Sequence, residues 1–299
     1  MSQQTLIMAV IGIILVIDAA LLLYAAIRWF RKREIAFSEP WNLADAWFGV
    51  QYTVVMLGVL VGLFAGVMVA LNPAIPLSNI ESFDFSNVTT TLNLWLPSFI
   101  LQDAVLFAVP AALIVLKYGY RLRDIGLPPL PSGRDWKLGL SLGVLLLLVT
   151  SGIGWGLERL AQAFDHIPMV KQALEYERTN PVNELIQVLP RLGIPGLILA
   201  ILGVGIGPGF GEEMLFRGFL FNVFRKQWGL WAGILLSALV FTVGHTYALG
   251  LLPVFLMGVA LAWIYHRTGS LWIPILIHAV NNTASVVIAF FFPETVAGT

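Results

Sequence analysis

The chain has 299 residues, of which 58% are apolar and 11% carry a charge. Soluble domains contain about 25% charged residues, so this composition excludes a water-soluble globule and a disordered chain. The 17 Lys and Arg residues balance the 17 Asp and Glu residues, so no basic excess indicates a nucleic-acid partner. The sequence contains no cysteine, which excludes disulfides, thiolate metal sites and a cysteine nucleophile.

The hydropathy pattern predicts an all-α protein, a polytopic membrane helical bundle of eight to nine transmembrane helices. A membrane helix needs about 20 mostly apolar residues, and the runs lack the two-residue alternation of membrane β-strands. The stretch 187–226 is long enough for one crossing or for two short ones, which leaves the count open. The other expected spans are 6–27, 45–71, 94–116, 138–157, 230–245, 249–265 and 271–292. We expect 6–27 to be a retained helix, because the features of a signal peptide are absent.

The distribution of basic residues predicts the orientation of a multi-pass protein of the cell membrane. Lys and Arg follow the first and third expected helices, whereas 72–93 contains neither. The positive-inside rule therefore places 28–44 and 117–137 in the cytoplasm. The segment 158–193 is then external, either as an amphipathic helix on the membrane or as a solvated loop.

Three parts of the chain are expected from this pattern. Residues 1–157 form N-terminal transmembrane helices, and 158–189 form an external or interfacial segment. Residues 190–292 form a transmembrane core that contains most of the polar residues within apolar spans. Such residues cost free energy in the bilayer and are functional candidates for that reason.

The polar residues of this core occur in pairs at helical spacing. Residues four apart share a helix face, so each pair forms one stripe. The pairs are Glu213 with Arg217, Phe241 with His245, and His278 with Asn282. A lone His or Asn in a membrane helix often only hydrogen-bonds a neighbouring helix. The adjacent acids Glu212 and Glu213 are harder to explain, because one Arg cannot neutralise both carboxylates.

Two further acids lie inside expected spans, and one helix break is expected. We interpret Asp18 and Asp103 as helix–helix hydrogen-bonding or snorkelling residues. Alternating glycines with Pro208 among them predict a break in the helix. A new helix would begin near Phe210 with the Glu pair in its first turn, where the helix dipole favours the ionised carboxylate and burial opposes it.

These side chains are sufficient for attack of water on an amide. A carboxylate with a His can hold and deprotonate one water, and a second His with an Asn can stabilise the oxyanion. Glu and His are also zinc ligands, but the sequence lacks His-Glu-x-x-His. We therefore expect no metal and no other cofactor.

The pattern Glu212-Glu213-x-x-x-Arg217, Phe241-x-x-x-His245 and His278-x-x-x-Asn282 resembles the three motifs of a known family. This is the CAAX protease and bacteriocin-processing (CPBP) family, which includes the type II CAAX prenyl endopeptidase. The resemblance covers about residues 190–292, which would form the catalytic core. It implies a glutamate-dependent intramembrane endopeptidase that acts on a peptide or protein substrate near the bilayer surface, prenylated or not.

The same resemblance implies a role for each motif residue. Glu212 would be the general base, and His245 would help to activate the water. His278 and Asn282 would form the oxyanion site. The remaining two residues would support the site, Arg217 by holding Glu213 and Phe241 by lining it.

The number of crossings in 187–226 decides the face on which this site opens. With one crossing, Arg225 and Lys226 are cytoplasmic and the site opens outward. With two crossings and a turn at Gly207-Pro208-Gly209, the site opens to the cytoplasm, which is the arrangement we expect.

Two other functions remain open for the same polar cluster. A proton-coupled transporter could use it as a relay, although transporters usually show two related halves. A non-catalytic membrane scaffold or immunity protein could keep the same fold.

Overall fold

The computed structural model describes residues 40–72, 75, 85–179, 181–245 and 247–293, together with residues 17, 18 and 20. All regular structure in these ranges is helical, as predicted. Most of the expected first span, 6–27, lies outside the described residues.

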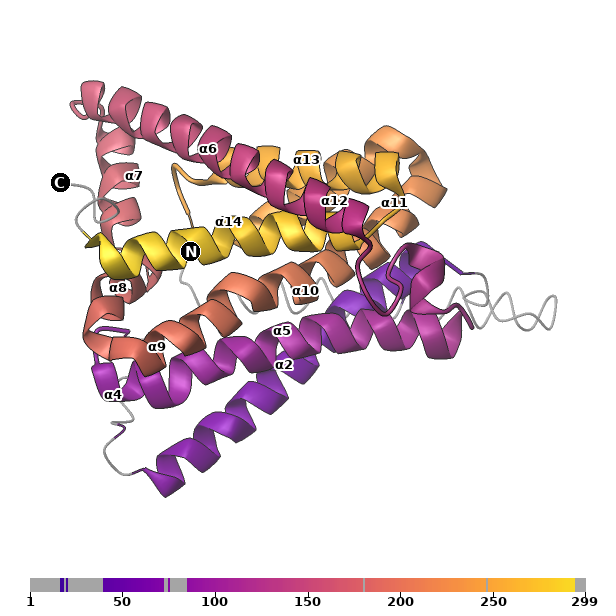
Figure 1. Ribbon diagram of the computed structural model, residues 1–299, viewed down its shortest axis with the longest axis horizontal. Coiled ribbons are helices and arrows are strands. Elements are labelled where there is room, and N and C mark those ends of the chain that lie inside the picture. The colour runs from indigo at the N-terminus through magenta and orange to yellow at the C-terminus, as the bar shows by residue number, and fades with distance from the viewer. Residues whose placement is uncertain are drawn as a thin grey trace.

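The first half of the described chain forms three long helical runs (Figure 1). They consist of α2 (Leu43–Leu71), then α4 (Val88–Thr90), η1 (Thr91–Trp95), α5 (Leu96–Ala112) and η2 (Leu113–Lys117) in one run, and α6 (Gly133–Ala163). The short η3 (Leu122–Ile125) lies between the second and the third run.

The second half begins with shorter helices and ends with the bundle core (Figure 1). The helices are α7 (Pro168–Thr179), α8 (Pro181–Val188), η4 (Leu189–Leu192), α9 (Gly193–Ala200), η5 (Ile201–Ile206), α10 (Gly207–Glu213), η6 (Met214–Leu220), α11 (Phe221–Trp228), α12 (Leu230–Val243), α13 (Leu251–Thr268) and α14 (Trp272–Phe291). α7 and α8 fall within the segment predicted to be external or interfacial.

Six helical runs of the described chain are long and apolar enough to cross a membrane. They are Leu43–Leu71, Val88–Lys117, Gly133–Ala163, Asn183–Trp228, Leu251–Thr268 and Trp272–Phe291. A seventh apolar helix, α12, is shorter. Each overlaps an expected span, but the predicted total of eight to nine is not confirmed.

Local signals in the sequence fix several helix ends. Before α6, Ser132 Oγ accepts a hydrogen bond from Asp135 N at 3.2 Å, and the Asp135 carboxylate accepts one from Ser132 N at 2.7 Å. This reciprocal capping box satisfies amide groups that have no partner within the helix. At the C-terminal end of α13, Gly269 adopts a left-handed conformation with φ of 67°. Glycine reaches this conformation without steric cost.

The predicted turn at Gly207-Pro208-Gly209 is wrong. The chain stays helical from Gly193 to Trp228 and crosses the bundle once through α9, α10 and α11 (Figure 1). The π-helical turn η5 precedes Pro208, and there Gly207 N bonds to Leu202 O, five residues back. Such a widened turn accommodates irregular hydrogen bonding without reversing the chain. The Glu pair therefore lies within a long helix and not in its first turn.

The glycines near Pro208 serve close packing. A Cβ on Gly205 would lie 2.7 Å from Thr283 Oγ1, and one on Gly209 would lie 2.8 Å from Ile275 O. Both contacts are with α14, so a side chain at either position would push the two helices apart. The sequence pattern that we read as a helix break therefore marks a helix–helix contact.

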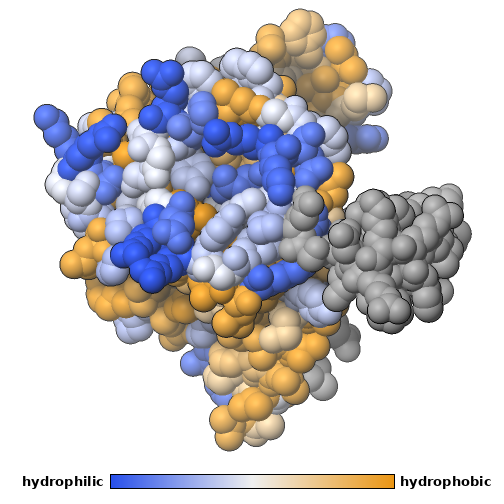
Figure 2. Space-filling model, turned by 90° about the vertical axis from the view of Figure 1, so that its right-hand side faces the viewer, coloured by the Kyte–Doolittle hydropathy of each residue, from blue (hydrophilic) through white to orange (hydrophobic). Residues whose placement is uncertain are grey.

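The exterior of the bundle is apolar, whereas one end is polar. Leu63 on α2 and Leu148 on α6 are 63% and 66% exposed, and monomeric soluble proteins rarely expose large contiguous apolar patches. Figure 2 shows hydrophilic residues gathered over the end at the right of Figure 1, with hydrophobic residues along the sides.

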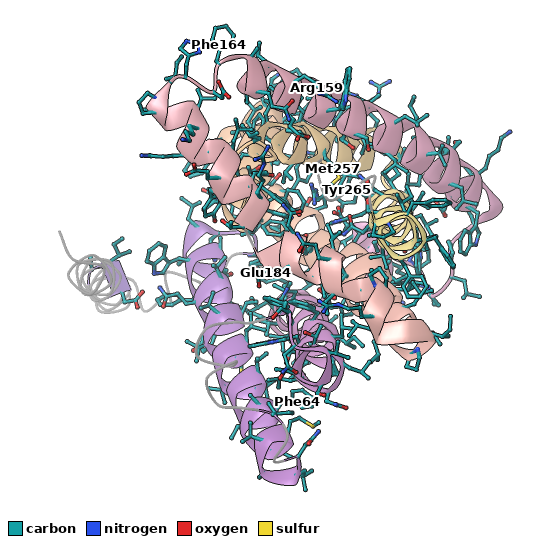
Figure 3. The ribbon with its side chains drawn as sticks, turned by 90° about the vertical axis from the view of Figure 1, so that its left-hand side faces the viewer. Phe64, Arg159, Phe164, Glu184, Met257 and Tyr265 are labelled. Carbon is teal, nitrogen blue, oxygen red and sulfur yellow. The ribbon has the colours of Figure 1, made fainter. Side chains whose placement is uncertain are left out.

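The loops at this end contact one another. Lys226 Nζ donates to Pro40 O at 2.6 Å, and Leu271 N donates to Gly126 O at 2.9 Å. We call it the basic end because Lys117, Arg121, Arg123, Arg134, Arg225, Lys226 and Arg267 lie at or near the helix termini there. The helices α7 and α8 lie at the opposite end, which Figure 3 views with Phe164 at its outer edge.

Candidate active site

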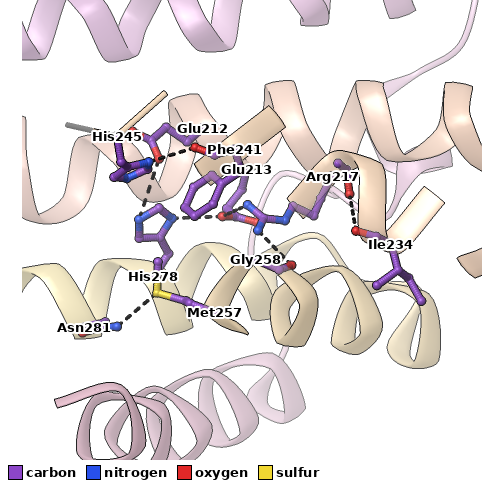
Figure 4. Close-up of polar contacts among 11 residues, drawn as sticks. Glu212, Glu213, Arg217, Ile234, Phe241, His245, Met257, Gly258, His278 and Asn281 are labelled. Atoms are coloured by element: carbon purple, nitrogen blue, oxygen red, sulfur yellow. Dashed lines mark hydrogen bonds and ion pairs between the residues drawn. The ribbon is translucent and has the colours of Figure 1, made fainter. Parts of the chain in front are cut away.

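Three helices bring the sequence-predicted residues together inside the bundle (Figure 4). Glu212 and Glu213 end α10, Phe241 lies in the last turn of α12, and His278 lies in α14. His245 follows α12 in the turn that leads to α13. The π-helical turn η6 begins directly after Glu213 and contains Arg217. π-Helical turns often occur at functional sites, where they re-aim side chains.

Glu213 is the centre of a fully buried ionic chain. Its Oε1 accepts a hydrogen bond from Arg217 at 2.6 Å and lies 2.9 Å from His278 Nδ1. The side chains of Glu213 and Arg217 are 0% exposed, and that of His278 is 1% exposed. Arg217 also donates to Gly258 O at 3.2 Å, and this hydrogen bond attaches the ionic group to α13. A buried charge is tolerated only when it is paired in this way.

Glu212 lies beside this chain but has a different environment. Its side chain is 16% exposed, and its Oε2 lies 3.9 Å from His278 Nε2, beyond hydrogen-bond distance. The same oxygen is buried and has no hydrogen-bond partner among the described residues. A buried polar atom normally has a partner, so this oxygen is available to water or to a substrate N–H group.

His245 faces the same space as Glu212 (Figure 4). Its Nδ1 lies 2.9 Å from Phe241 O. A carbonyl oxygen only accepts, so Nδ1 carries a proton, and Nε2 is the ring nitrogen left for water. The Phe241 ring packs against both imidazoles, with centroid distances of 4.7 Å to His245 and 5.9 Å to His278. The Arg217 guanidinium lies over the same ring at 4.6 Å.

Asn282 lies near these side chains but makes no hydrogen bond to them. It lies one turn after His278 on α14 and is half-buried. No hydrogen bond among the described residues joins its amide to the carboxylates or the imidazoles. The neighbouring Asn281 is 8% exposed and donates to Met257 Sδ at 3.2 Å. The structure therefore brings Glu212, Glu213, Arg217, Phe241, His245 and His278 into contact, and leaves Asn282 at the edge of this group.

The turn after His245 contains a residue that the sequence interpretation missed. Tyr247 stacks on His245 with a centroid distance of 6.0 Å. Burial, together with the charges of Glu177 and Glu212, raises the pKa of Tyr247 to about 12. Its hydroxyl therefore keeps its proton at neutral pH and can donate a hydrogen bond. Its position two residues after the motif His was the only signal in the sequence.

Glu177 of α7 holds this turn in place. Its Oε2 accepts hydrogen bonds from Ala248 N at 2.8 Å and Leu249 N at 3.0 Å. A cavity of about 210 Å³ adjoins the contact. It is lined by Gly154, Glu158, Leu174, Glu177, Arg178, Asn183, Leu249 and Gly250. The α7 end of the molecule is thus connected directly to the turn that carries His245.

The two acids predicted to hydrogen-bond neighbouring helices behave differently. Asp18 accepts from Trp47 Nε1 at 2.5 Å and from Gln51 Nε2 at 2.9 Å, so that prediction is confirmed. Asp103 is 5% exposed, and neither carboxyl oxygen has a hydrogen-bond partner among the described residues. The predicted helix–helix hydrogen bond is therefore wrong for Asp103.

The geometry permits hydrolysis of an amide by water. It offers a carboxylate oxygen without a hydrogen-bond partner, an imidazole that uses only Nδ1 in its hydrogen bond to Phe241 O, and a second imidazole fixed by Glu213 and Arg217. Within the described ranges, no three His, Asp or Glu side chains are grouped so that they could hold a metal ion. The absence of a cofactor stays a prediction.

Residues 194–284 match the family model described as Type II CAAX prenyl endopeptidase Rce1-like. The "Uncharacterized 24.3 kDa protein" of Escherichia coli is 37% identical over 95 residues, which are 30% of this chain and 44% of that relative. The "Putative membrane peptidase YdiL" of Bacillus subtilis (strain 168) is 26% identical over 171 residues, which are 56% of this chain and 64% of that relative. No solved structure matches the chain.

These findings confirm the resemblance read from the three motifs. The matched region contains all seven motif residues, from Glu212 to Asn282. The chain spans about half the length of the first relative and somewhat more of the second. Together with the six apolar helical runs, they make the chain a multi-pass integral membrane protein whose residues 194–284 are similar to the Rce1-like family.

Proposed function

Because residues 194–284 are similar to the Rce1-like family, we propose that the chain is an intramembrane glutamate endopeptidase. It hydrolyses a peptide bond of a membrane-associated or lipidated substrate with water activated by Glu212 and His245. One observation carries this proposal: the Glu212 oxygen without a hydrogen-bond partner lies 3.9 Å from His278 and faces the same space as His245 (Figure 4). Glu213, in contrast, is held by Arg217 at 2.6 Å and by His278 at 2.9 Å.

In the proposed reaction, Glu212 takes a proton from the attacking water while the oxygen forms a bond to the carbonyl carbon. The free Nε2 of His245 accepts the second hydrogen bond of the water. The carbon–nitrogen bond then breaks, and the proton on Glu212 passes to the leaving amine nitrogen. A positioned general base of this kind contributes typically 10²–10⁴-fold to a rate.

The oxyanion is stabilised by His278 in this proposal. Glu213 accepts from Nδ1 of His278 and lies next to Arg217, which fixes the ring orientation. In the proposed step His278 holds a proton on each ring nitrogen, so that Nδ1–H donates to Glu213 and Nε2–H donates to the developing charge. Asn282 supplies a second donor after a rotation of its amide, and Phe241 forms a wall of the site.

We further propose that the site opens on the non-cytoplasmic face. The turn that contains His245 is bound by Glu177 of α7, at the end opposite the basic end. With a single crossing by 193–228, the positive-inside rule places the basic end in the cytoplasm. Labelling of an Ala248→Cys variant with an impermeant reagent tests this. Reaction from outside is expected, and reaction only from the cytoplasmic side would contradict it.

The experiment that tests the activity compares peptides in membranes from cells with wild-type chain and with Glu212→Gln. Peptides that appear only with the wild type are expected. A Glu175→Gln variant serves as the matched control, because that side chain is 63% exposed on α7. An uptake assay with a pH gradient in proteoliposomes separates the endopeptidase from a transporter. Uptake that depends on Glu212, without any cleavage, would overturn the proposal.

A further inference from the structure

Asp103 lies on α5, before the matched domain that starts at residue 194. It is 5% exposed, and both carboxyl oxygens lack a partner among the described residues. An ionised carboxylate in this setting would be strongly destabilising, because nothing replaces its lost hydration. A neutral carboxylic acid avoids this penalty and has one O–H group to donate.

The adjacent face of α10 is shaped to admit this carboxyl group. A Cβ on Gly207 would lie 2.0 Å from Asp103 Oδ2, and one on Gly211 would lie 2.6 Å from Asp103 O. A side chain at position 211 would require α5 to shift, and a side chain at position 207 would displace the Asp103 carboxyl group. Since Glu212 follows Gly211 directly, the two glycines place Asp103 against the turn that carries the proposed base.

Charges on the surrounding helices leave Glu212 as the electrostatic partner of Asp103. Glu212 is the ionisable group whose charge acts on Asp103. Arg217 on η6 is paired with Glu213 at 2.6 Å, and Asp45 on α2 is paired with Lys117. Two carboxyl groups that share a buried site do not both ionise, so one of them holds a proton.

The environment decides which carboxyl group holds this proton. The Glu212 side chain is 16% exposed, and its Oε2 faces the His278 ring at 3.9 Å. Asp103 is 5% exposed, and no cation or donor among the described residues contacts its oxygens. The negative charge is therefore favoured on Glu212 and the proton on Asp103.

We infer that Asp103 is a positioning residue for the proposed reaction: a neutral acid that donates a hydrogen bond toward Glu212 through a bridging water. This bond keeps Glu212 ionised and aimed at the attacking water. The proton of Asp103 stays on Asp103 throughout, while the water proton moves to Glu212 and then to the amine. The inference rests on the proposed function, and it extends the site to a helix outside residues 194–284.

The test compares Asp103→Asn with Asp103→Leu in the purified full chain, reconstituted into vesicles. Asn keeps a neutral donor of the same size, so we expect kcat within about threefold of wild type. Leu removes the donor, so kcat should fall about 10- to 100-fold, the range for a hydrogen bond to a charged group. The acid limb of its pH profile should move to higher pH, since Glu212 becomes easier to protonate. Ser98→Ala, on the same helix, is the control and should match wild type.

Two kinetic results would overturn the inference. An Asn variant as inactive as the Leu variant would mean that the ionised form is required. An acid limb that moves to lower pH in the Leu variant would mean that Asp103 repels the charge on Glu212. Glu212→Gln is measured in parallel, because wild-type cleavage by that variant would refute the endopeptidase itself.

An infrared measurement tests the protonation state without any activity. The difference spectrum between wild type and Asp103→Asn at neutral pH should lose the carbonyl band of a protonated carboxylic acid. Loss of carboxylate bands alone would contradict the inference. This measurement decides the protonation state of Asp103 even if the Leu variant does not fold.

Discussion

The buried polar cluster has two halves that differ in how their charges are compensated. In the first half, Glu213 lies between Arg217 and His278 at 2.6 and 2.9 Å, and all three side chains are buried. In the second half, Glu212 is 16% exposed, and its Oε2 has no hydrogen-bond partner among the described residues. Adjacent residues of one helix thus provide a carboxylate held by two short ionic contacts and a carboxylate with a single, longer contact to His278. The difference indicates that the first half holds the site together and the second half reacts.

Removal of Arg217, the cation of the first half, should have the largest effect on stability. In an Arg217→Leu variant, Glu213 remains buried without its counter-ion. Breaking a buried ion pair in this way costs about 3–5 kcal/mol, so the midpoint of thermal unfolding in detergent should fall strongly. Arg267→Leu, at an exposed position on α13, is the control. Equal midpoints for both variants would show that the ionic chain contributes nothing to the fold.

Removal of the His245 imidazole, which lies beside Glu212 in the second half, should mainly affect activity. His245→Ala deletes the group that accepts a hydrogen bond from the water, and we expect kcat to fall about 100-fold. The unfolding midpoint should change little, because His245 is only half-buried. His166→Ala, at an exposed position, should behave like wild type. A His245→Ala variant that loses stability and keeps its turnover would reverse the assignment of the two halves.

Weakening of the contact between α7 and the His245 turn should have a smaller effect. Glu177→Gln keeps an acceptor but loses the charge that strengthens the bonds from Ala248 N and Leu249 N at 2.8 and 3.0 Å. A loss of about 1 kcal/mol corresponds to roughly a fivefold fall in kcat/KM. The exposed Glu175→Gln on the same helix should have no effect. A similar fall in both variants would mean that α7 acts through its net charge.

Metal chelation should have the smallest effect. The proposed reaction uses a carboxylate and imidazoles as the only activating groups, so a strong chelator should leave the cleavage rate within about twofold. Dialysis against the chelator, followed by an assay with and without added zinc, measures this. Loss of activity that zinc restores would instead assign Glu212, His245 and His278 to a metal centre.

The parts of the site that follow from local spacing could be predicted from the sequence. A four-residue interval places Glu213 and Arg217 on one helix face, and the structure contains that pair at 2.6 Å. The apolar runs located the long helices to within a few residues of their ends. These features depend on periodicity, which one sequence displays fully.

Features that depend on contacts between distant segments could not be predicted in this way. Gly207 and Pro208 predicted a turn, but a π-helical turn and close packing keep the helix continuous. Asp103 looked like an ordinary hydrogen-bonding residue, yet it meets a glycine face of α10 that lies about a hundred residues away. Glu177 and the His245 turn are 71 residues apart. Nothing in their local sequence indicates that contact.

In the proposed reaction Glu212, and not the neighbouring Glu213, is the reacting carboxylate. The most direct test measures cleavage and thermal unfolding for Glu212→Gln in the purified, reconstituted full chain. We expect this variant to unfold at the wild-type temperature and to cleave at least about 100-fold more slowly. Wild-type cleavage by folded Glu212→Gln would contradict the proposed reaction.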